Sequence, residues 1–147
     1  MSRFKKLSHT VWDCKYHLVW CPKYRFRVME GPLRHYVRDV IRELCRRHKV
    51  DIVEGNVQKE HIHLVLSIPP SYCVSRVIGF LKGKSAIQIF RKFTRLRKKY
   101  YGQHYWSRGY CVSTVGLDEE TIRNYVRWQQ KKAQEEDGAA QQELNLT

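Results

Sequence analysis

Two strand-like runs lie almost back to back in the middle of this chain and constrain its fold more than any other feature. The runs are VDIVEGNV over residues 50–57 and HIHLVLSI over residues 61–68. Branched and apolar side chains favour extended backbone, and so short a connection joins neighbouring antiparallel strands. Pro69 and Pro70 end the second run, because proline has no backbone N–H to donate. The sequence therefore predicts an antiparallel hairpin.

Helical and strand-like segments flank this hairpin on both sides. Apolar residues recur at helical spacing from Leu33 to Cys45, after a proline that suits a first helical turn. The predicted elements are a strand over 10–20, a helix from Pro32 to about Lys49, the hairpin, a helix over 74–93, a strand over 109–116, and a last helix that Asp118 caps and that ends near 134. This order predicts an α+β fold of the ferredoxin-like βαββαβ type. Its four-stranded antiparallel sheet would carry helices on one face, with a C-terminal helix added.

The length of the chain, 147 residues, suits one domain with a hydrophobic core. We assign residues 1–134 to this domain. The remaining residues, 135–147, read EEDGAAQQELNLT and have lost the basic charge and most large apolar side chains. This composition predicts a mobile polar tail, or an arm used on a partner.

The cysteines and the apolar segments bear on the compartment. Cys14, Cys21, Cys45, Cys73 and Cys111 are scattered and form no close pair of the kind that structural zinc sites use. They predict reduced thiols in a cytoplasmic protein. The N-terminus has no apolar core of signal-peptide length, and no run of about 18 apolar residues occurs. Secretion and membrane spanning are not expected.

The charge of the chain is strongly positive and unevenly distributed. Lysine and arginine number 28 against 14 acidic residues, which gives a formal net charge of +14. Such an excess points to a polyanionic partner, whereas a generically basic protein would show no clustering. The clusters are Lys23, Arg25 and Arg27 beside Tyr24 and Phe26, the pair Lys82 and Lys84, and Arg91, Lys92, Arg95, Arg97, Lys98, Lys99, Tyr105, Trp106 and Arg108.

Cations interleaved with aromatic rings are typical of proteins that bind single-stranded nucleic acid. The cations follow the phosphates and the rings stack on unpaired bases, at about 1–3 kcal/mol per base. The alternative is a solvated basic face above buried aromatic residues. No segment has the glycine and lysine spacing of a phosphate-binding loop, so no nucleotide cofactor is expected.

Two histidines stand one residue apart in the second strand of the hairpin. Strand side chains alternate between faces, so His61 and His63 share one face, and Ile62 and Leu64 share the core face. Their backbones are about 6.5 Å apart, near enough for both imidazoles to bind one ion. Two surface histidines without a ligand remain an alternative. If a metal binds, oxygen ligands would complete its shell, which favours Mg²⁺ or Mn²⁺ and phosphate chemistry.

The last predicted helix carries a second polar pair. Tyr125 and Gln129 are four residues apart and therefore neighbours on one helix face. The spacing leaves open whether Tyr125 is a functional phenol or packs with Ile122 and Val126 in the core.

Taken together, these segments resemble the HUH-type single-tyrosine transposases of small bacterial and archaeal insertion sequences. The resemblance covers about residues 8–132 and includes the histidine, hydrophobic residue, histidine motif of His61–His63. The other matching segments are YHLVWCPKYR, EHIHLVLSIPP, VSRVIGFLKGKSA, YWSRGYCVSTVG and IRNYVRWQ.

The resemblance implies a mechanism and a set of site residues. His61, His63 and Gln129 would bind a divalent metal, Mg²⁺ or Mn²⁺, and Tyr125 would be the nucleophile. It also implies recognition of hairpins in single-stranded DNA at element ends, a covalent 5′-phosphotyrosine intermediate, and a homodimer whose active sites are shared between subunits in many members. The protein would then act in a prokaryotic cytoplasm, at the nucleoid.

Two other classes of protein remain as alternatives. A non-catalytic or domesticated nucleic-acid-binding module of the same fold would bind DNA in a salt-dependent way and not cleave it. A structural zinc protein would unfold when its metal is chelated, but the scattered cysteines argue against it.

Overall fold

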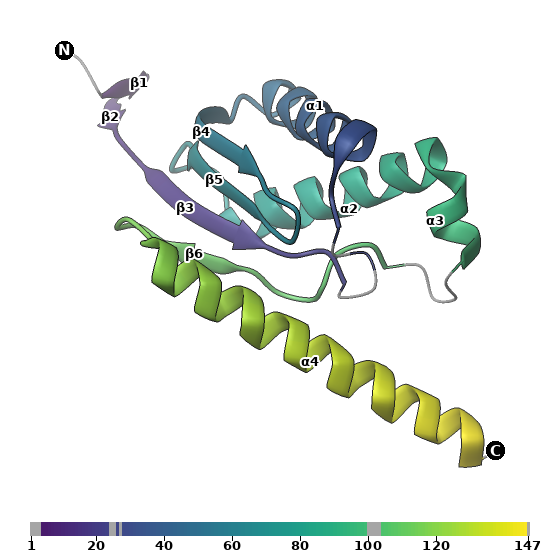
Figure 1. Ribbon diagram of the computed structural model, residues 1–147. Helices are drawn as coiled ribbons and strands as arrows, with labels where there is room; N and C mark the ends of the chain where they lie inside the picture. Colours follow the sequence, from purple (N-terminus) through teal and green to yellow (C-terminus); the bar gives the residue numbers. More distant parts are fainter. Residues whose placement is uncertain (1–3, 24–25, 27, 100–103, 147) are drawn as a thin grey trace.

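The computed structural model of the protein describes residues 4–23, 26, 28–99 and 104–146. Its main sheet has the strand order β4 (Asp51–Val57), β5 (Ile62–Ser67), β3 (Lys15–Trp20) and β6 (Cys111–Ser113), and every neighbouring pair is antiparallel. The helices are α1 (Gly31–Arg47), α2 (Val74–Lys92), α3 (Thr94–Lys99) and α4 (Glu119–Leu146). The order of elements confirms the predicted ferredoxin-like βαββαβ fold, with α4 as the added C-terminal helix (Figure 1).

The predicted first strand differs from the observed one. The chain begins with a separate hairpin of β1 (Lys5–Leu7) and β2 (Thr10–Trp12), and β3 starts only at Lys15. β2 pairs with β1, whereas β3 pairs with β5, so the chain changes partner between Trp12 and Lys15. A single strand over 10–20 was therefore a wrong prediction. No element was predicted where α3 lies.

One face of the sheet carries the main hydrophobic core. Ile62, Leu64 and Leu66 of β5 are at most 3% exposed and point toward α1 and α2, which cover this face together (Figure 1). The helices contribute Val37, Ile41, Leu44, Ile78, Leu81 and Ile89 to the same cluster. Each fully buried side chain of this size stabilises the fold by about 1.5–3 kcal/mol. The alternation predicted for β5 is confirmed on this side.

The opposite face of the sheet carries α4. A second, smaller cluster joins Val19 and Cys21, at the end of β3, to Ile122 and Val126 of α4. Figure 1 shows α4 running along the side of β3 and β6 that faces away from α1 and α2. The sheet therefore lies between two layers of helix, and the two layers differ in how much apolar surface they bury.

α4 begins where the sequence predicted and ends later. The Thr121 amide donates to the Asp118 carboxylate at 2.7 Å, which confirms Asp118 as the cap, and this bond holds the pKa of Asp118 below its ordinary value. The helix was predicted to end near 134, but it continues to Leu146 through the segment predicted as a tail. Alanine, glutamine and glutamate dominate this segment and are strong helix formers, which offsets Gly138. No helix within the described ranges is long and apolar enough to cross a membrane.

Candidate active site

The strand register brings the two predicted histidines onto the face that α4 covers. His63 lies opposite Val19 of β3 and Asn56 of β4, and His61 directly precedes β5. Val19 belongs to the cluster under α4, so the side chains that share its face also point toward that helix. The side-chain amide of Gln130, on α4, donates to the Glu60 carboxylate at 3.2 Å, which ties the helix to the residue before His61.

Both imidazoles are half-buried and retain unused ring nitrogens. Nδ1 of His61 and Nε2 of His63 are buried and have no hydrogen-bond partner among the described residues. Burial is the largest cause that lowers the pKa of each imidazole, so the neutral form is favoured. A neutral imidazole with a free nitrogen is the form that binds a metal. The two side chains therefore fit a divalent ion, which would satisfy nitrogens that are otherwise costly to bury.

A third imidazole, that of His17, lies beside His63 and was not predicted from the sequence. The rings of His17 and His63 are 6.0 Å apart between centroids, and Nδ1 of His17 is also buried without a partner among the residues described. His17 is two residues before Val19 on β3, so it shares the face of Val19. Alternation along β3 places His17 on the face of Val19, but only the pairing of β3 with β5 brings it beside His63.

Tyr125 and Gln129 of α4 touch each other, as their spacing predicted. The Gln129 Nε2 donates to the Tyr125 hydroxyl at 3.1 Å and to the Arg108 carbonyl at 2.5 Å. Gln129 is only 3% exposed. Because its nitrogen makes both bonds, the amide oxygen is a candidate hard ligand for a metal.

The Tyr125 phenol is half-buried rather than sealed in the core. Its ring packs against the small cluster of Val19, Cys21, Ile122 and Val126. The ring packs, as the core interpretation expects, and the hydroxyl makes a polar contact, while the role of Tyr125 as a functional phenol stays a prediction. Burial raises the pKa of Tyr125 far above its ordinary value, and the hydrogen bond from Gln129 opposes that shift. The phenol is fully protonated in this state.

Within the described ranges, no three His, Cys, Asp or Glu side chains converge on a point that could hold a metal. A structural zinc site would need such a cluster. The predicted ligands, two imidazoles and one amide oxygen, would form a different class of site.

Several of the predicted DNA-binding cations are exposed. Lys84 on α2, Arg91 and Lys92 at its end, Arg95 on α3 and Arg108 before β6 all face solvent. Lys23 is half-buried. Arg97, Lys98 and Lys99 belong to α3, but their side chains lie outside what the structure describes, as do residues Arg25 and Arg27.

Burial and internal hydrogen bonds engage three of the predicted DNA-binding residues within the protein. Tyr105 is fully buried, with its ring 5.4 Å from that of Phe26, and Trp106 is 5% exposed and donates its Nε1 to the Ser85 hydroxyl. Neither ring offers a face to a base, so the prediction that they stack on DNA was wrong. Lys82 is not a free cation, because its ammonium donates to the Ser107 and Gly109 carbonyls at 2.9 and 2.7 Å.

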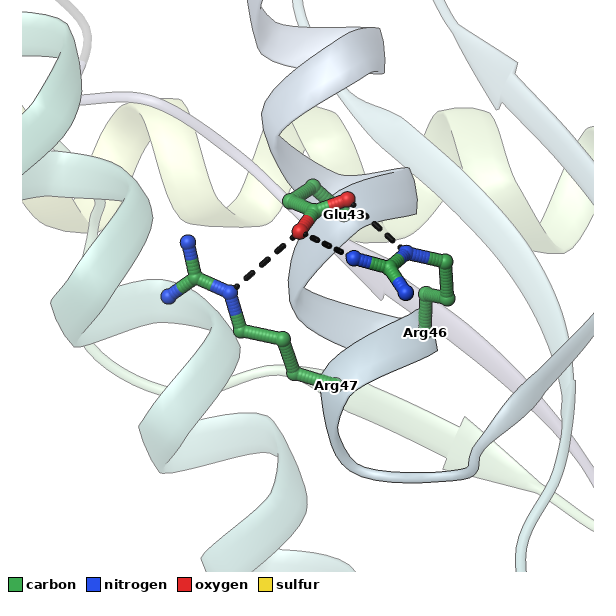
Figure 2. Close-up of polar contacts among 3 residues, drawn as sticks. All are labelled: Glu43, Arg46 and Arg47. Carbon is green, nitrogen blue, oxygen red and sulfur yellow. Dashed lines mark hydrogen bonds and ion pairs between the residues drawn. The ribbon is translucent and has the colours of Figure 1, made fainter.

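Basic residues at the end of α1 are also engaged within the protein. Figure 2 shows the Glu43 carboxylate accepting two bonds from Arg46, at 2.7 and 3.0 Å, and one from Arg47 at 3.4 Å. The bond from Arg46 is the largest cause that lowers the pKa of Glu43. This surface is therefore partly neutralised, unlike the end of α2.

A cavity of about 460 Å³ opens beside the Gln129 anchor. It is lined by Lys23, His104, Trp106, Arg108 and Glu136. Arg108 links it to the candidate site, because its carbonyl accepts the Gln129 amide while its side chain lines the cavity. The positively charged lining and the open volume fit a phosphate and its sugar.

Sequence comparisons place the chain among transposases. The model of the family described as Transposase IS200 like matches residues 10–129. A transposase for insertion sequence element IS200 from Salmonella typhimurium (strain LT2) is 42% identical over 129 residues, which are 88% of this chain and 85% of that protein. The ISDra2 transposase TnpA from Deinococcus radiodurans is 31% identical over 129 residues, which are 87% of this chain and 92% of that protein.

Solved structures show the same fold. A crystal structure of a candidate transposase from Deinococcus radiodurans R1 has a TM-score of 0.75 and 29% identity, over 85% of this chain and 97% of that one. A REP-associated tyrosine transposase bound to a REP hairpin has a TM-score of 0.52 and 15% identity, over 86% of this chain and 68% of that one. The second likeness is one of fold alone.

Proposed function

The chain belongs to the IS200-like transposase family, and we propose that it cleaves and rejoins single-stranded DNA through a covalent bond between Tyr125 and a 5′-phosphate. The observation that carries this proposal is the packing of Tyr125, which Gln129 contacts, against the sheet face that bears His63 and, by alternation, His61. A nucleophile, an amide oxygen and two unpartnered imidazoles on one side of a sheet are the groups that phosphoryl transfer to a side chain needs.

The proposed reaction conserves the number of phosphodiester bonds. The Tyr125 oxygen attacks the scissile phosphorus, the bond from phosphorus to the 3′-oxygen breaks, and that oxygen leaves as a 3′-hydroxyl after taking a proton. A 3′-hydroxyl then attacks the phosphotyrosine, which reseals a strand and releases the phenol. No nucleotide is consumed, since the phosphotyrosine keeps the bond energy.

His61, His63 and the Gln129 amide oxygen would hold a Mg²⁺ or Mn²⁺ ion. When bound, such an ion neutralises developing charge on the phosphate oxygens and polarises the phosphorus. Residues of the chain must still favour loss of the Tyr125 proton, because burial favours the protonated phenol in the free protein. The Gln129 amide, which already donates to the Tyr125 oxygen, would stabilise the phenolate as the proton leaves.

Hairpin DNA is the proposed substrate. Exposed cations at the end of α2 and on α3, together with Arg108, would contact the phosphates, and the cavity beside Arg108 would receive the strand near the scissile position. The relative solved with a REP hairpin supports this choice of substrate by its fold.

The direct test uses a hairpin-bearing single strand with Mg²⁺ or Mn²⁺ and detects a covalent protein–DNA adduct on a denaturing gel. Tyr125→Phe should abolish the adduct, while the matched control Tyr72→Phe, at a tyrosine 38% exposed, should leave it intact. An adduct that persists in Tyr125→Phe would refute the nucleophile. Salt-dependent binding without cleavage at any metal concentration would instead favour the non-catalytic module.

We propose a homodimer as the active unit, and mixing two variants tests whether sites are shared. Neither Tyr125→Phe nor the double variant His61→Ala/His63→Ala has a complete site of its own. If mixed dimers regain adduct formation, Tyr125 serves the histidines of the partner subunit. If they do not, each Tyr125 serves its own histidines. The dimer would be refuted if light scattering found only a monomer and that monomer formed the adduct.

A further inference from the structure

Lys82 is a half-buried cation that hydrogen-bonds within the protein, which the sequence did not reveal. Its Nζ donates to the Ser107 carbonyl at 2.9 Å and to the Gly109 carbonyl at 2.7 Å. Burial lowers the pKa of Lys82 to about 8. The ammonium therefore contacts the backbone of residues 107–109 and bridges the two carbonyls on either side of Arg108.

The Arg108 carbonyl, which lies between the Ser107 and Gly109 carbonyls in the chain, points to the candidate site. The Arg108 carbonyl accepts the Gln129 Nε2 at 2.5 Å, and the same nitrogen donates to the Tyr125 hydroxyl at 3.1 Å. Gly109 has a φ of +82°, a left-handed conformation that glycine adopts without strain. Lys82 and Gln129 therefore hold three consecutive carbonyls, and the site depends on the middle one.

The segment just before is held by other groups. The Ser107 amide donates to the Cys21 carbonyl at 2.8 Å, and the Ser107 hydroxyl donates to the Pro22 carbonyl at 3.2 Å. Trp106 is fixed by its bond to Ser85. Removal of Lys82 would therefore leave residues 105–107 anchored, and would free the backbone at 108 and 109 that meets Gln129.

We propose that Lys82 is a positioning residue of the active site. By holding the 107–109 backbone, it fixes the Arg108 carbonyl, which in turn orients the Gln129 amide so that its nitrogen faces Tyr125 and its oxygen faces the metal. The inference rests on the proposed function, in which Gln129 is a metal ligand. Partners that orient a ligand typically change metal affinity about 10–100-fold when they are removed.

The first experiment measures Mn²⁺ binding to the full chain without DNA, by the paramagnetic resonance of free Mn²⁺. Lys82→Met, which keeps the apolar stem and removes the donor, should weaken Mn²⁺ binding about 10–100-fold. Lys84→Met is the matched control, because Lys84 is exposed on the same helix and its loss removes the same charge. Equal Mn²⁺ affinity in Lys82→Met and the wild type, or an equal loss in Lys84→Met, would overturn the proposal.

A double-variant cycle tests whether Lys82 acts through Gln129. In a Gln129→Ala background, Lys82→Met should weaken Mn²⁺ binding by no more than about twofold further. If the two substitutions instead weaken Mn²⁺ binding by factors that multiply, Lys82 and Gln129 act independently and the proposal is overturned. If Lys82→Met does not fold, Lys82→Gln, whose shorter amide cannot bridge both carbonyls, replaces it in both experiments.

Hydrogen exchange of the free chain separates this proposal from the proposed function. Amides at residues 108–111 and 125–130 should exchange faster in Lys82→Met than in Lys84→Met, while those of β5 stay unchanged. If the wild type binds no Mn²⁺, the metal part of the proposed function fails, and hydrogen exchange alone tests the positioning role of Lys82. Unchanged exchange at 108–111 would refute the positioning role even if Tyr125 forms the DNA adduct.

Discussion

The two faces of the four-stranded sheet bury different kinds of side chain. The face toward α1 and α2 carries most of the buried apolar residues, including Ile62, Leu64 and Leu66. The face toward α4 has a small apolar cluster at one end of β3, and beside it imidazoles whose buried nitrogens lack partners in the described part of the chain. One strand, β5, supplies both faces through alternate residues. The comparison shows that alternate residues of a single strand can supply an apolar core on one face and polar side chains on the other.

The largest effect should come from the polar side chains of the α4 face. We expect His61→Ala/His63→Ala to reduce adduct formation at least about 10³-fold, since loss of a bound ion removes several kcal/mol of stabilisation from the transition state. The melting temperature should not fall, because two buried and unpartnered nitrogens are removed. His9→Ala/His35→Ala, at two exposed histidines, is the control. A large fall in melting temperature would show that the α4 face also supports the fold.

The next effect contrasts apolar truncations on the two faces. Leu66→Ala should lower the free energy of unfolding by about 2–5 kcal/mol, because it leaves a cavity in the main core. Val126→Ala, in the small cluster, should lower it by about 1–2 kcal/mol. Urea titration of both variants measures the difference. Equal losses would mean that α4 is as firmly packed as α1 and α2.

Two cysteines provide a smaller and more local contrast. Cys21 under α4 and Cys45 on α1 are 1% and 2% exposed, and burial raises the pKa of each thiol to about 12. Because only the thiolate reacts, alkylation of both should rise with pH between 7 and 9. Cys21 should react about tenfold faster than Cys45, since α4 can open locally without disrupting the main core. Mass spectrometry of iodoacetamide-treated protein gives both rates, and equal rates would contradict a less stable α4 face.

The smallest effect on the stability of the fold is expected from removal of metal. Chelation with EDTA should abolish adduct formation while it shifts the melting temperature by no more than about 2 °C, because apolar packing in the main core, and not the proposed ion, supplies most of the stability. Differential scanning fluorimetry with and without EDTA checks this. A collapse of the fold on chelation would revive the structural zinc alternative.

The sequence predicted the fold well where the pattern was local. The central hairpin, α1, α2 and the cap of α4 follow from alternation, helical spacing and a capping aspartate, each set by neighbours along the chain. The resemblance to single-tyrosine transposases is confirmed at the level of the family. The roles of Tyr125, His61, His63 and Gln129 stay predictions, although the structure brings the first and last of them into contact.

The failures of prediction concern contacts between distant segments. Tyr105 and Trp106 stand in a basic, aromatic stretch that predicts a DNA-binding surface, but they pack on Phe26, Phe90 and Trp20 from elsewhere in the chain. Lys82 belongs to a basic pair with Lys84, yet the two have opposite surroundings. No local pattern distinguishes a cation that will bind carbonyls 25 residues later from one that faces solvent.

By itself, the sequence determined the order of elements, the core face of β5 and the pairs His61–His63 and Tyr125–Gln129, because backbone periodicity places residues two or four apart on one face. Only the tertiary structure decided that α4 lies across the sheet from α1 and α2, that His17 lies beside His63, and that Lys82 holds the backbone to which Gln129 is bonded. The physical reason is that burial and hydrogen-bond partners depend on which surfaces meet in space.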